Sequence, residues 1–221
     1  VTVLEVDQEA LDKGISVIKR NYDIQVQRGR MSEAEVDERM SLLSGTTDYQ
    51  GLSSADVIIE AVYENIDVKV ETFKKIEAVA KPGAILASNT SGLDVDKMAE
   101  ATARPDAVIG LHFFSPANVM KLLEVVRGEN TSKETIATSM KLGRTLNKIA
   151  VLSGNAPGFI GNRMLSGYTQ QASEIILQGA TPYQVDNVLL QFGMPMGPFQ
   201  MNDLVGLDLG WRARKLSGMK P

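Results

Sequence analysis

The chain of 221 residues contains no cysteine and only one histidine. The absence of cysteine excludes disulfides, cysteine-based metal sites and thiol nucleophiles, and it fits a reducing compartment. With His112 as the sole histidine, a histidine-rich metal site is impossible, and any imidazole chemistry has to take place at that residue. The sequence shows none of the usual sets of metal ligands, so we expect no metal.

The sequence also lacks a surplus of basic residues and any long apolar run. Lys and Arg number 23 against 27 Asp and Glu, and the resulting net charge of -4 argues against a nucleic-acid binder. No apolar stretch approaches the roughly 18 residues of a membrane span. The chain has 43% hydrophobic and 23% charged residues, which predicts a globular fold with a sizeable core.

The first residue is Val1 rather than a methionine, and it lies directly in a strand-like run, whereas the chain ends at Pro221 after a polar helical stretch. We therefore expect an internal piece of a longer protein. The lack of a signal peptide is then uninformative.

Strand-like runs alternate with helical patterns over residues 1–153, which predicts a mostly parallel sheet with helices on both faces. The turn-rich segment 154–158 follows, and only helical patterns come after it. We expect an α/β domain at 1–153 and an all-α domain at 154–221. Strands are expected at 1–6, 57–62, 84–88, 108–112, 122–126 and 149–152, with helices near 11–22, 66–76, 95–101, 132–146, 159–178 and 182–192. A capping box formed by Ser32 and Glu35 predicts the start of one more helix.

Polar side chains gather where the predicted strands end. Asp7, Glu64, the segment 89–91 and His112 each follow or end a different strand. Ligands of open α/β sheets bind beyond the carboxyl ends of the strands, so the set predicts a binding site. Each residue taken alone is equally well explained as a turn or cap residue.

Glu124 lies inside the apolar run 122–126. A buried carboxylate needs a partner or a proton. An edge strand that exposes Glu124 to solvent is one explanation. The other is a hydrogen bond to His112, which would fix the imidazole tautomer and prepare the ring for proton transfer near neutral pH. We predict this hydrogen bond, with heavy atoms within about 3.2 Å.

Five segments carry motifs that recur together: 88–91 (SNTS), 110–116 (GLHFFSP), 120–126 (MKLLEVV), 157–163 (PGFIGNR) and 193–199 (GMPMGPF). Together these motifs resemble the L-3-hydroxyacyl-CoA dehydrogenase family. They occur in order over almost all of the chain, and such a series is more specific than any one motif. Ser115 replaces an asparagine that is common in single-function members; together with Gly92 and the segment 206–212, it is more similar to the multifunctional β-oxidation enzymes, which carry an enoyl-CoA hydratase unit upstream.

The resemblance implies a Rossmann domain that binds NAD, followed by a helical domain used in dimer formation and substrate binding, both truncated here. The implied reaction is the NAD-dependent oxidation of L-3-hydroxyacyl-CoA to 3-oxoacyl-CoA in fatty-acid β-oxidation. It also implies the site residues: His112 as catalytic acid/base, Glu124 as its partner, Ser91 and Asn162 binding the 3-oxygen of the substrate, Asp7 holding the adenosine ribose, and Glu64, Lys69 and Asn89 lying along the cofactor.

The implied partner is an acyl-CoA, within a dimer or a larger multidomain chain located in the cytoplasm or, in a eukaryote, in the peroxisome or mitochondrial matrix. Apolar residues at 159–176 either form an association surface or pack internally. Two other functions remain open. One is a related dehydrogenase of the same fold that acts on another hydroxy acid; the other is a non-catalytic module, against which the joint presence of Ser91, His112, Glu124 and Asn162 argues.

No G-x-G-x-x-G motif occurs in the 221 residues, because Gly154, Gly158 and Gly161 do not have that spacing. In a Rossmann order the first, central strand and its glycine-rich turn would precede Val1. We therefore expect these residues alone to bind NAD weakly or not at all, and the strands at 1–6 and 57–62 to have unpaired edges.

Overall fold

The structure is a computed structural model that describes residues 1–207 and Trp211. It divides into two compact units, Val1–Phe159 and Ile160–Pro221. Within the segment 206–212 compared above with the multifunctional enzymes, Asp208, Leu209, Gly210 and Arg212 lie outside the described residues.

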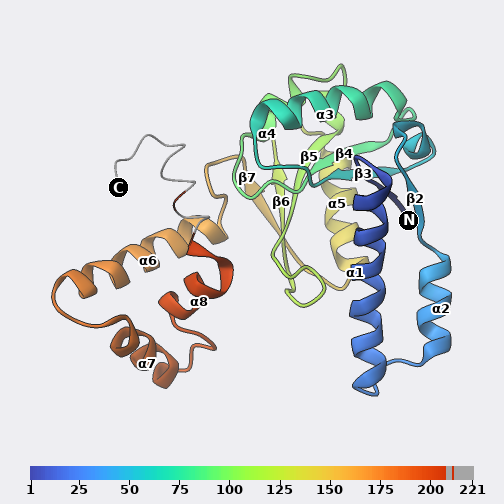
Figure 1. Ribbon diagram of the computed structural model, residues 1–221. Helices are drawn as coiled ribbons and strands as arrows, with labels where there is room; N and C mark the ends of the chain where they lie inside the picture. The colour runs from blue at the N-terminus through green and yellow to red at the C-terminus, as the bar shows by residue number, and fades with distance from the viewer. Residues whose placement is uncertain (208–210, 212–221) are drawn as a thin grey trace. The chain divides into compact units, whose positions relative to one another are not determined.

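The first unit contains two separate sheets (Figure 1). The smaller one pairs β1 (Thr2–Leu4) with β2 (Ser44–Thr46) in parallel. The larger one has the strand order β3-β4-β5-β6-β7, and all its neighbours are parallel except the antiparallel pair β5–β6. Its strands are β3 (Val57–Glu60), β4 (Ile85–Ser88), β5 (Val108–Phe113), β6 (Leu122–Arg127) and β7 (Ile149–Gly154).

Helices cover both faces of the larger sheet, as the alternating pattern predicts. On one face α3 (Ile66–Val79) and α4 (Val95–Ala99) pack over a cluster that includes Phe73 and Met98. On the other face α5 (Lys133–Thr145) contributes Met140 to a second cluster with Ile109 and Leu123. The remaining elements of the unit are α1 (Gln8–Gln27), α2 (Glu33–Ser41), η1 (Tyr49–Leu52) and η2 (Pro105–Ala107).

The second unit consists of α6 (Gly161–Leu177), α7 (Pro182–Phe192) and α8 (Pro198–Val205) in its described part. A capping box between Thr181 and Gln184 starts α7, and Gly193, at φ +108°, ends it. Several apolar residues of the unit are exposed, among them Met164, Ile175, Val188 and Phe192. Among the described residues, none of the helices combines the length and apolar character needed to cross a membrane.

The compact units divide after Phe159, somewhat beyond the expected boundary near residue 153. The turn before this point belongs to the first unit because its side chains bind there. The amide of Asn155 donates to Asp94 and Asp96, both at 2.6 Å, and the Phe159 ring is 1% exposed in the cluster under α3 and α4. Phe159 also has a positive φ of 49°, a strained conformation that this packing holds in place.

Candidate functional site

Four polar side chains lie on one face of the larger sheet because strand side chains alternate between faces. Glu60 and Ser88 pair across β3 and β4, and His112 and Glu124 pair across β5 and β6. Each is an even number of residues from an apolar residue of the cluster beneath α3 and α4, so all four point to that face. These apolar residues are Ile58, Leu86, Val108 and Val126.

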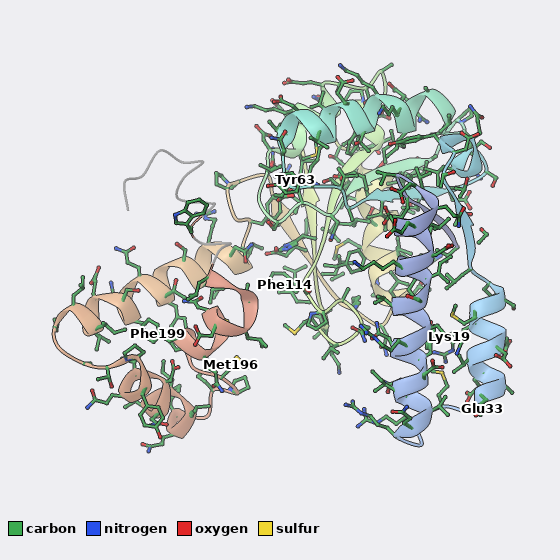
Figure 2. The ribbon with its side chains drawn as sticks, in the orientation of Figure 1. Lys19, Glu33, Tyr63, Phe114, Met196 and Phe199 are labelled. Atoms are coloured by element: carbon green, nitrogen blue, oxygen red, sulfur yellow. The ribbon has the colours of Figure 1, made fainter. Side chains whose placement is uncertain are left out.

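The hydrogen bond predicted between His112 and Glu124 is present. His112 Nδ1 lies 2.7 Å from Glu124 Oε2, and the side chains are 7% and 1% exposed. The explanation of Glu124 as a solvent-exposed residue of an edge strand is wrong, since β6 lies between β5 and β7. The rings of Phe114 and Phe159 flank the imidazole at centroid distances of 4.4 and 5.9 Å; Phe114, just beyond β5, is labelled in Figure 2.

Because an ionised Glu124 can only accept, the Nδ1 atom of a neutral His112 carries the proton of this hydrogen bond. The lone pair of a neutral imidazole then resides on Nε2. The pair is therefore arranged as a general base whose second nitrogen is oriented by a carboxylate.

Glu64 binds the turn that follows β4. Its Oε1 accepts hydrogen bonds from Thr90 Oγ1 at 2.7 Å, from the Ser91 amide at 2.9 Å and from Ser91 Oγ at 3.0 Å. Burial alone would raise the pKa of the Glu64 carboxyl, but these hydrogen bonds and the Lys69 charge outweigh it, so the pKa lies below its usual value. The carboxylate thus fixes the turn that carries Ser91.

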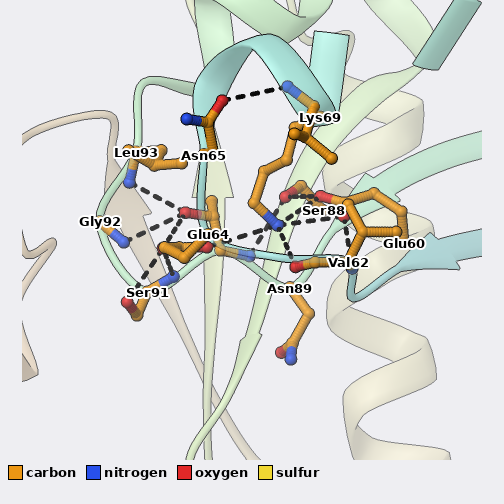
Figure 3. A network of polar contacts seen from close by, with 12 residues as sticks. Glu60, Val62, Glu64, Asn65, Lys69, Ser88, Asn89, Ser91, Gly92 and Leu93 are labelled. Atoms are coloured by element: carbon orange, nitrogen blue, oxygen red, sulfur yellow. Dashed lines mark hydrogen bonds and ion pairs between the residues drawn. The ribbon is translucent and has the colours of Figure 1, made fainter. Parts of the chain in front are cut away.

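Lys69 is buried behind Glu64 (Figure 3). Its ammonium donates to both Glu60 oxygens at 3.1 and 3.0 Å and to the Val62 carbonyl at 3.3 Å, and it forms an ion pair with Glu64 at 3.3 Å. Ser88 Oγ donates a short hydrogen bond to Glu60. Sequence reasoning missed Glu60, although it ends an apolar run in the same way that Glu124 interrupts one.

Asn89 and Asp7 both make structural contacts. Asn89 Oδ1 accepts the Phe113 amide at 2.9 Å, which ties the end of β4 to the strand end that carries His112. Asp7 Oδ1 accepts the Ala10 amide at 2.8 Å and is the N-cap of α1.

The structure thus gathers six of the predicted residues at the ends of adjacent strands of the larger sheet or in direct contact with them. His112 and Glu124 come from β5 and β6, Ser91 and Asn89 follow β4, and Glu64 follows β3. Lys69, from α3, contacts Glu64. Asp7 follows β1 of the smaller sheet, and Asn162 lies in the first turn of α6 in the other unit.

Comparison with protein families gives two adjoining matches. Residues 1–156 match the family described as 3-hydroxyacyl-CoA dehydrogenase, NAD binding domain. Residues 158–220 match the family described as 3-hydroxyacyl-CoA dehydrogenase, C-terminal domain.

The relatives include a protein named peroxisomal bifunctional enzyme from Danio rerio, with 46% identity over 99% of this chain and 30% of the relative. Among solved structures, FadB2 of M. tuberculosis is 38% identical with a TM-score of 0.90, over 94% of this chain and 74% of that one. (S)-3-hydroxybutyryl-CoA dehydrogenase PaaH1 from Ralstonia eutropha is 34% identical with a TM-score of 0.90, over the same shares. The chain spans less than a third of the length of the curated relative.

Proposed function

Because this chain belongs to the 3-hydroxyacyl-CoA dehydrogenase family, we propose that it forms the dehydrogenase part of a longer enzyme of fatty-acid β-oxidation. The proposed reaction is the NAD-dependent oxidation of L-3-hydroxyacyl-CoA to 3-oxoacyl-CoA. The observation that carries the proposal is the buried hydrogen bond between His112 and Glu124 at the end of β5. A structural protein has no need of an imidazole arranged in this way.

In this reaction His112 removes a proton from the 3-hydroxyl of the substrate. The hydroxyl proton moves to Nε2, and the imidazolium that forms is stabilised by the Glu124 carboxylate at Nδ1. Burial strengthens this attraction, since the site is screened less than a surface pair. Proton transfer to a positioned base of this kind contributes on the order of 10²–10⁴-fold to the rate.

Ser91 and Asn162 bind the 3-oxygen of the substrate in this proposal. Hydrogen bonds to that oxygen stabilise the negative charge that develops as the proton leaves. The turn beside Glu64 supports the role of Ser91, because the backbone on which Ser91 stands is fixed by a carboxylate. Asn162 lies in the first turn of α6.

The described residues fit two parts of an NAD molecule. The Asp7 carboxylate, beyond β1, suits the diol of the adenosine ribose, and the polar groups of Glu64 and Asn89 beyond β3 and β4 suit the nicotinamide end. Lys69 is assigned to the same region, where its buried ammonium acts through Glu64. Bound NAD supplies the acceptor for the hydride that leaves C3 of the substrate.

Turnover of acetoacetyl-CoA with NADH by the full-length protein tests the proposed function. We expect NADH oxidation that depends on the CoA ester, with little activity on free acetoacetate. Equal activity on the free acid, or activity only on another hydroxy acid, would favour a related dehydrogenase of the same fold. The absence of any turnover with a range of 3-oxoacyl-CoA esters would contradict the proposal.

Association through the helical unit, as a dimer or within a longer chain, is part of the proposal. A cavity of about 300 Å³ between α6 and α7 is lined by apolar side chains that include Ile175, Val188 and Leu189, and Val188 is 65% exposed. We expect Val188→Glu to lower the sedimentation coefficient or the thermal stability of the full-length protein. The relative from Danio rerio is named as peroxisomal, and the same compartment is proposed for this chain in a eukaryotic source.

A further inference from the structure

Lys69 uses its hydrogen-bonding capacity inside the protein. An ammonium group has three protons, and its acceptors here are the Glu60 carboxylate, the Val62 carbonyl and the Glu64 carboxylate (Figure 3). The side chains of Lys69 and Glu60 are each 1% exposed. The Lys69 ammonium is therefore a structural group, and it affects the candidate site only through its contact with Glu64.

Stability alone does not explain a buried ion pair at this position. Removing two charges from water is costly, and well-packed apolar residues of similar volume often stabilise a fold equally well or better. The surroundings of Glu60 nevertheless accommodate its charge, because Ser88 Oγ and the Val62 amide both donate to it. The ion pair holds the Lys69 ammonium at a fixed position next to the Glu64 carboxylate.

The Glu64 carboxylate connects the Lys69 ammonium to the turn that carries Ser91. Its Oε2 faces Lys69, and its Oε1 binds Thr90 and Ser91. Thr90 Oγ1 in turn accepts the amides of Gly92 and Leu93 at 3.3 and 2.9 Å, so one carboxylate orders the whole turn. Each link in the chain from Glu60 to Ser91 is a charged or charge-assisted contact, which is stronger than a neutral one.

We infer that the buried Glu60–Lys69 ion pair is a positioning device for Ser91, which acts by holding the Glu64 carboxylate against the turn 90–93. Neither Glu60 nor Lys69 touches the substrate in this arrangement. The inference rests on the proposed function for its effect on turnover, since Ser91 is there assigned to the 3-oxygen. Its effect on the turn is independent of that assignment.

A neutral replacement of the pair tests the inference in the full-length protein. The double variant Glu60→Gln with Lys69→Met keeps both side-chain lengths, retains an acceptor for Ser88 and removes the charge that faces Glu64. We expect it to fold, to lose kcat about ten- to a hundredfold, and to change KM by less than about threefold. Hydrogen–deuterium exchange without substrate should show faster exchange for the amides of residues 91–93.

The matched control is Glu71→Gln with Lys74→Met. This pair makes the same chemical change on α3, the helix that carries Lys69, but its side chains are 62% and 54% exposed. Its kcat and its exchange at 91–93 should stay at the wild-type values. A folded test variant with kcat within about twofold of wild type would overturn the inference, and so would a loss of kcat without faster exchange in the turn.

A second variant keeps the inference testable if the double variant does not fold. Glu64→Gln leaves the buried pair intact and removes the transmitted charge, so it should show the same loss of kcat and the same faster exchange; unchanged exchange would overturn the inference. If the wild-type protein does not turn over acyl-CoA substrates, the proposed function fails, while the exchange measurement still decides whether the pair orders the turn.

Discussion

The pairing of His112 with Glu124 follows from the geometry of neighbouring strands. They lie directly opposite each other in the antiparallel ladder of β5 and β6, where facing side chains meet on one side of the sheet. Burial between neighbouring strands and two phenylalanine rings then limits the motion of the imidazole. The apolar run around Glu124 places the carboxylate in a buried strand, and His112 is its hydrogen-bond partner there.

Replacement of His112 by glutamine should lower kcat by about 10²–10⁴-fold and change KM little, because the proton acceptor acts mainly in the transition state. Steady-state kinetics of the full-length protein with acetoacetyl-CoA and NADH measure both constants. Asn162→Ala serves as comparison, since it removes only one of the proposed hydrogen bonds to the substrate oxygen and should be milder. A larger loss in Asn162→Ala than in His112→Gln would reverse this assignment of roles.

The lowered pKa of Glu64 predicts a dependence of stability on pH. Folding favours the ionised carboxylate, so its contribution is present above the pKa of the unfolded chain and is lost as the pH falls through the lower folded pKa. Because 41% of the side chain is exposed, screening limits the contribution to about 1 kcal/mol.

Thermal unfolding of wild type and Glu64→Gln at a series of pH values measures the contribution of the Glu64 carboxylate to stability. The wild type should be the more stable protein at pH 7, and the difference should close as the pH is lowered below about 5. Glu71→Gln, at a more exposed position, is the control and should show a smaller difference. A gap that widens in acid would mean that the fold favours the protonated carboxyl.

At the scale of elements, α8 depends on a residue from another helix. Its N-cap is Gly197, which has no side chain to cap with, and Asp186 of α7 instead accepts the amides of Phe199 at 3.0 Å and Gln200 at 2.9 Å. A Cβ at position 197 would collide with the Asp186 side chain. The glycine is thus required for the close approach that lets α7 cap α8.

Asp186→Ala should destabilise the helical unit by about 1–2 kcal/mol, since it leaves two helix N–H groups without their acceptor. Asp186→Asn should cost less, because one amide oxygen remains to accept. Denaturant unfolding measures the free energy of unfolding of both variants. Hydrogen–deuterium exchange of the amides of residues 198–205 measures how far α8 itself is destabilised. Equal stability of wild type and Asp186→Ala would show that water caps α8 as well as the carboxylate does.

Elements with their own sequence signal were predicted correctly, and elements made by distant contacts were missed. The capping box at Ser32 located the start of α2, and Ser132 located the start of α5. By contrast, β2 is a polar segment that becomes a strand by pairing with β1, and Gly45 lets Leu11 of α1 approach it closely. The cap of α8 likewise comes from Asp186, which no local pattern around Gly197 reveals.

The same distinction between local sequence signals and distant contacts applies to the residues of the candidate site. His112 and Glu124 were paired correctly from one apolar run and a unique histidine, whereas Glu60 was missed because its role depends on Lys69 and Ser88, which come from different elements. The motifs that resemble the family identified residues but not their contacts. The buried state of Lys69 in particular follows only from packing.

At the scale of the whole molecule, the two sheets of the first unit are not hydrogen-bonded to each other among the described residues. The strand β3 has a sheet partner only in β4, and β1 has one only in β2. Such edges offer backbone groups to a further strand. In a Rossmann arrangement that place is taken by the strand whose turn holds the pyrophosphate.

We expect a polypeptide of these 221 residues to bind NAD at least about 100-fold more weakly than the full-length protein, because its sequence contains no G-x-G-x-x-G turn to bind the pyrophosphate. Calorimetric titration of both proteins with NAD measures the difference. Adenosine alone, for which the proposed ribose contact of Asp7 suffices, is the comparison ligand and should show a smaller difference. Equal NAD affinity would mean that the cofactor lies elsewhere on the fold.

The antiparallel pairing of β5 with β6 also has a consequence for the order of folding. His112 and Glu124 are 12 positions apart, whereas Ser88 and Glu60 are 28 apart across a helical crossover. Closing the shorter loop costs less chain entropy, and pairings of low sequence separation form faster. We therefore expect His112 and Glu124 to pair as a hairpin-like nucleus before the parallel crossovers are complete, so that the proposed proton acceptor is in place earlier in folding than the turn that carries Ser91.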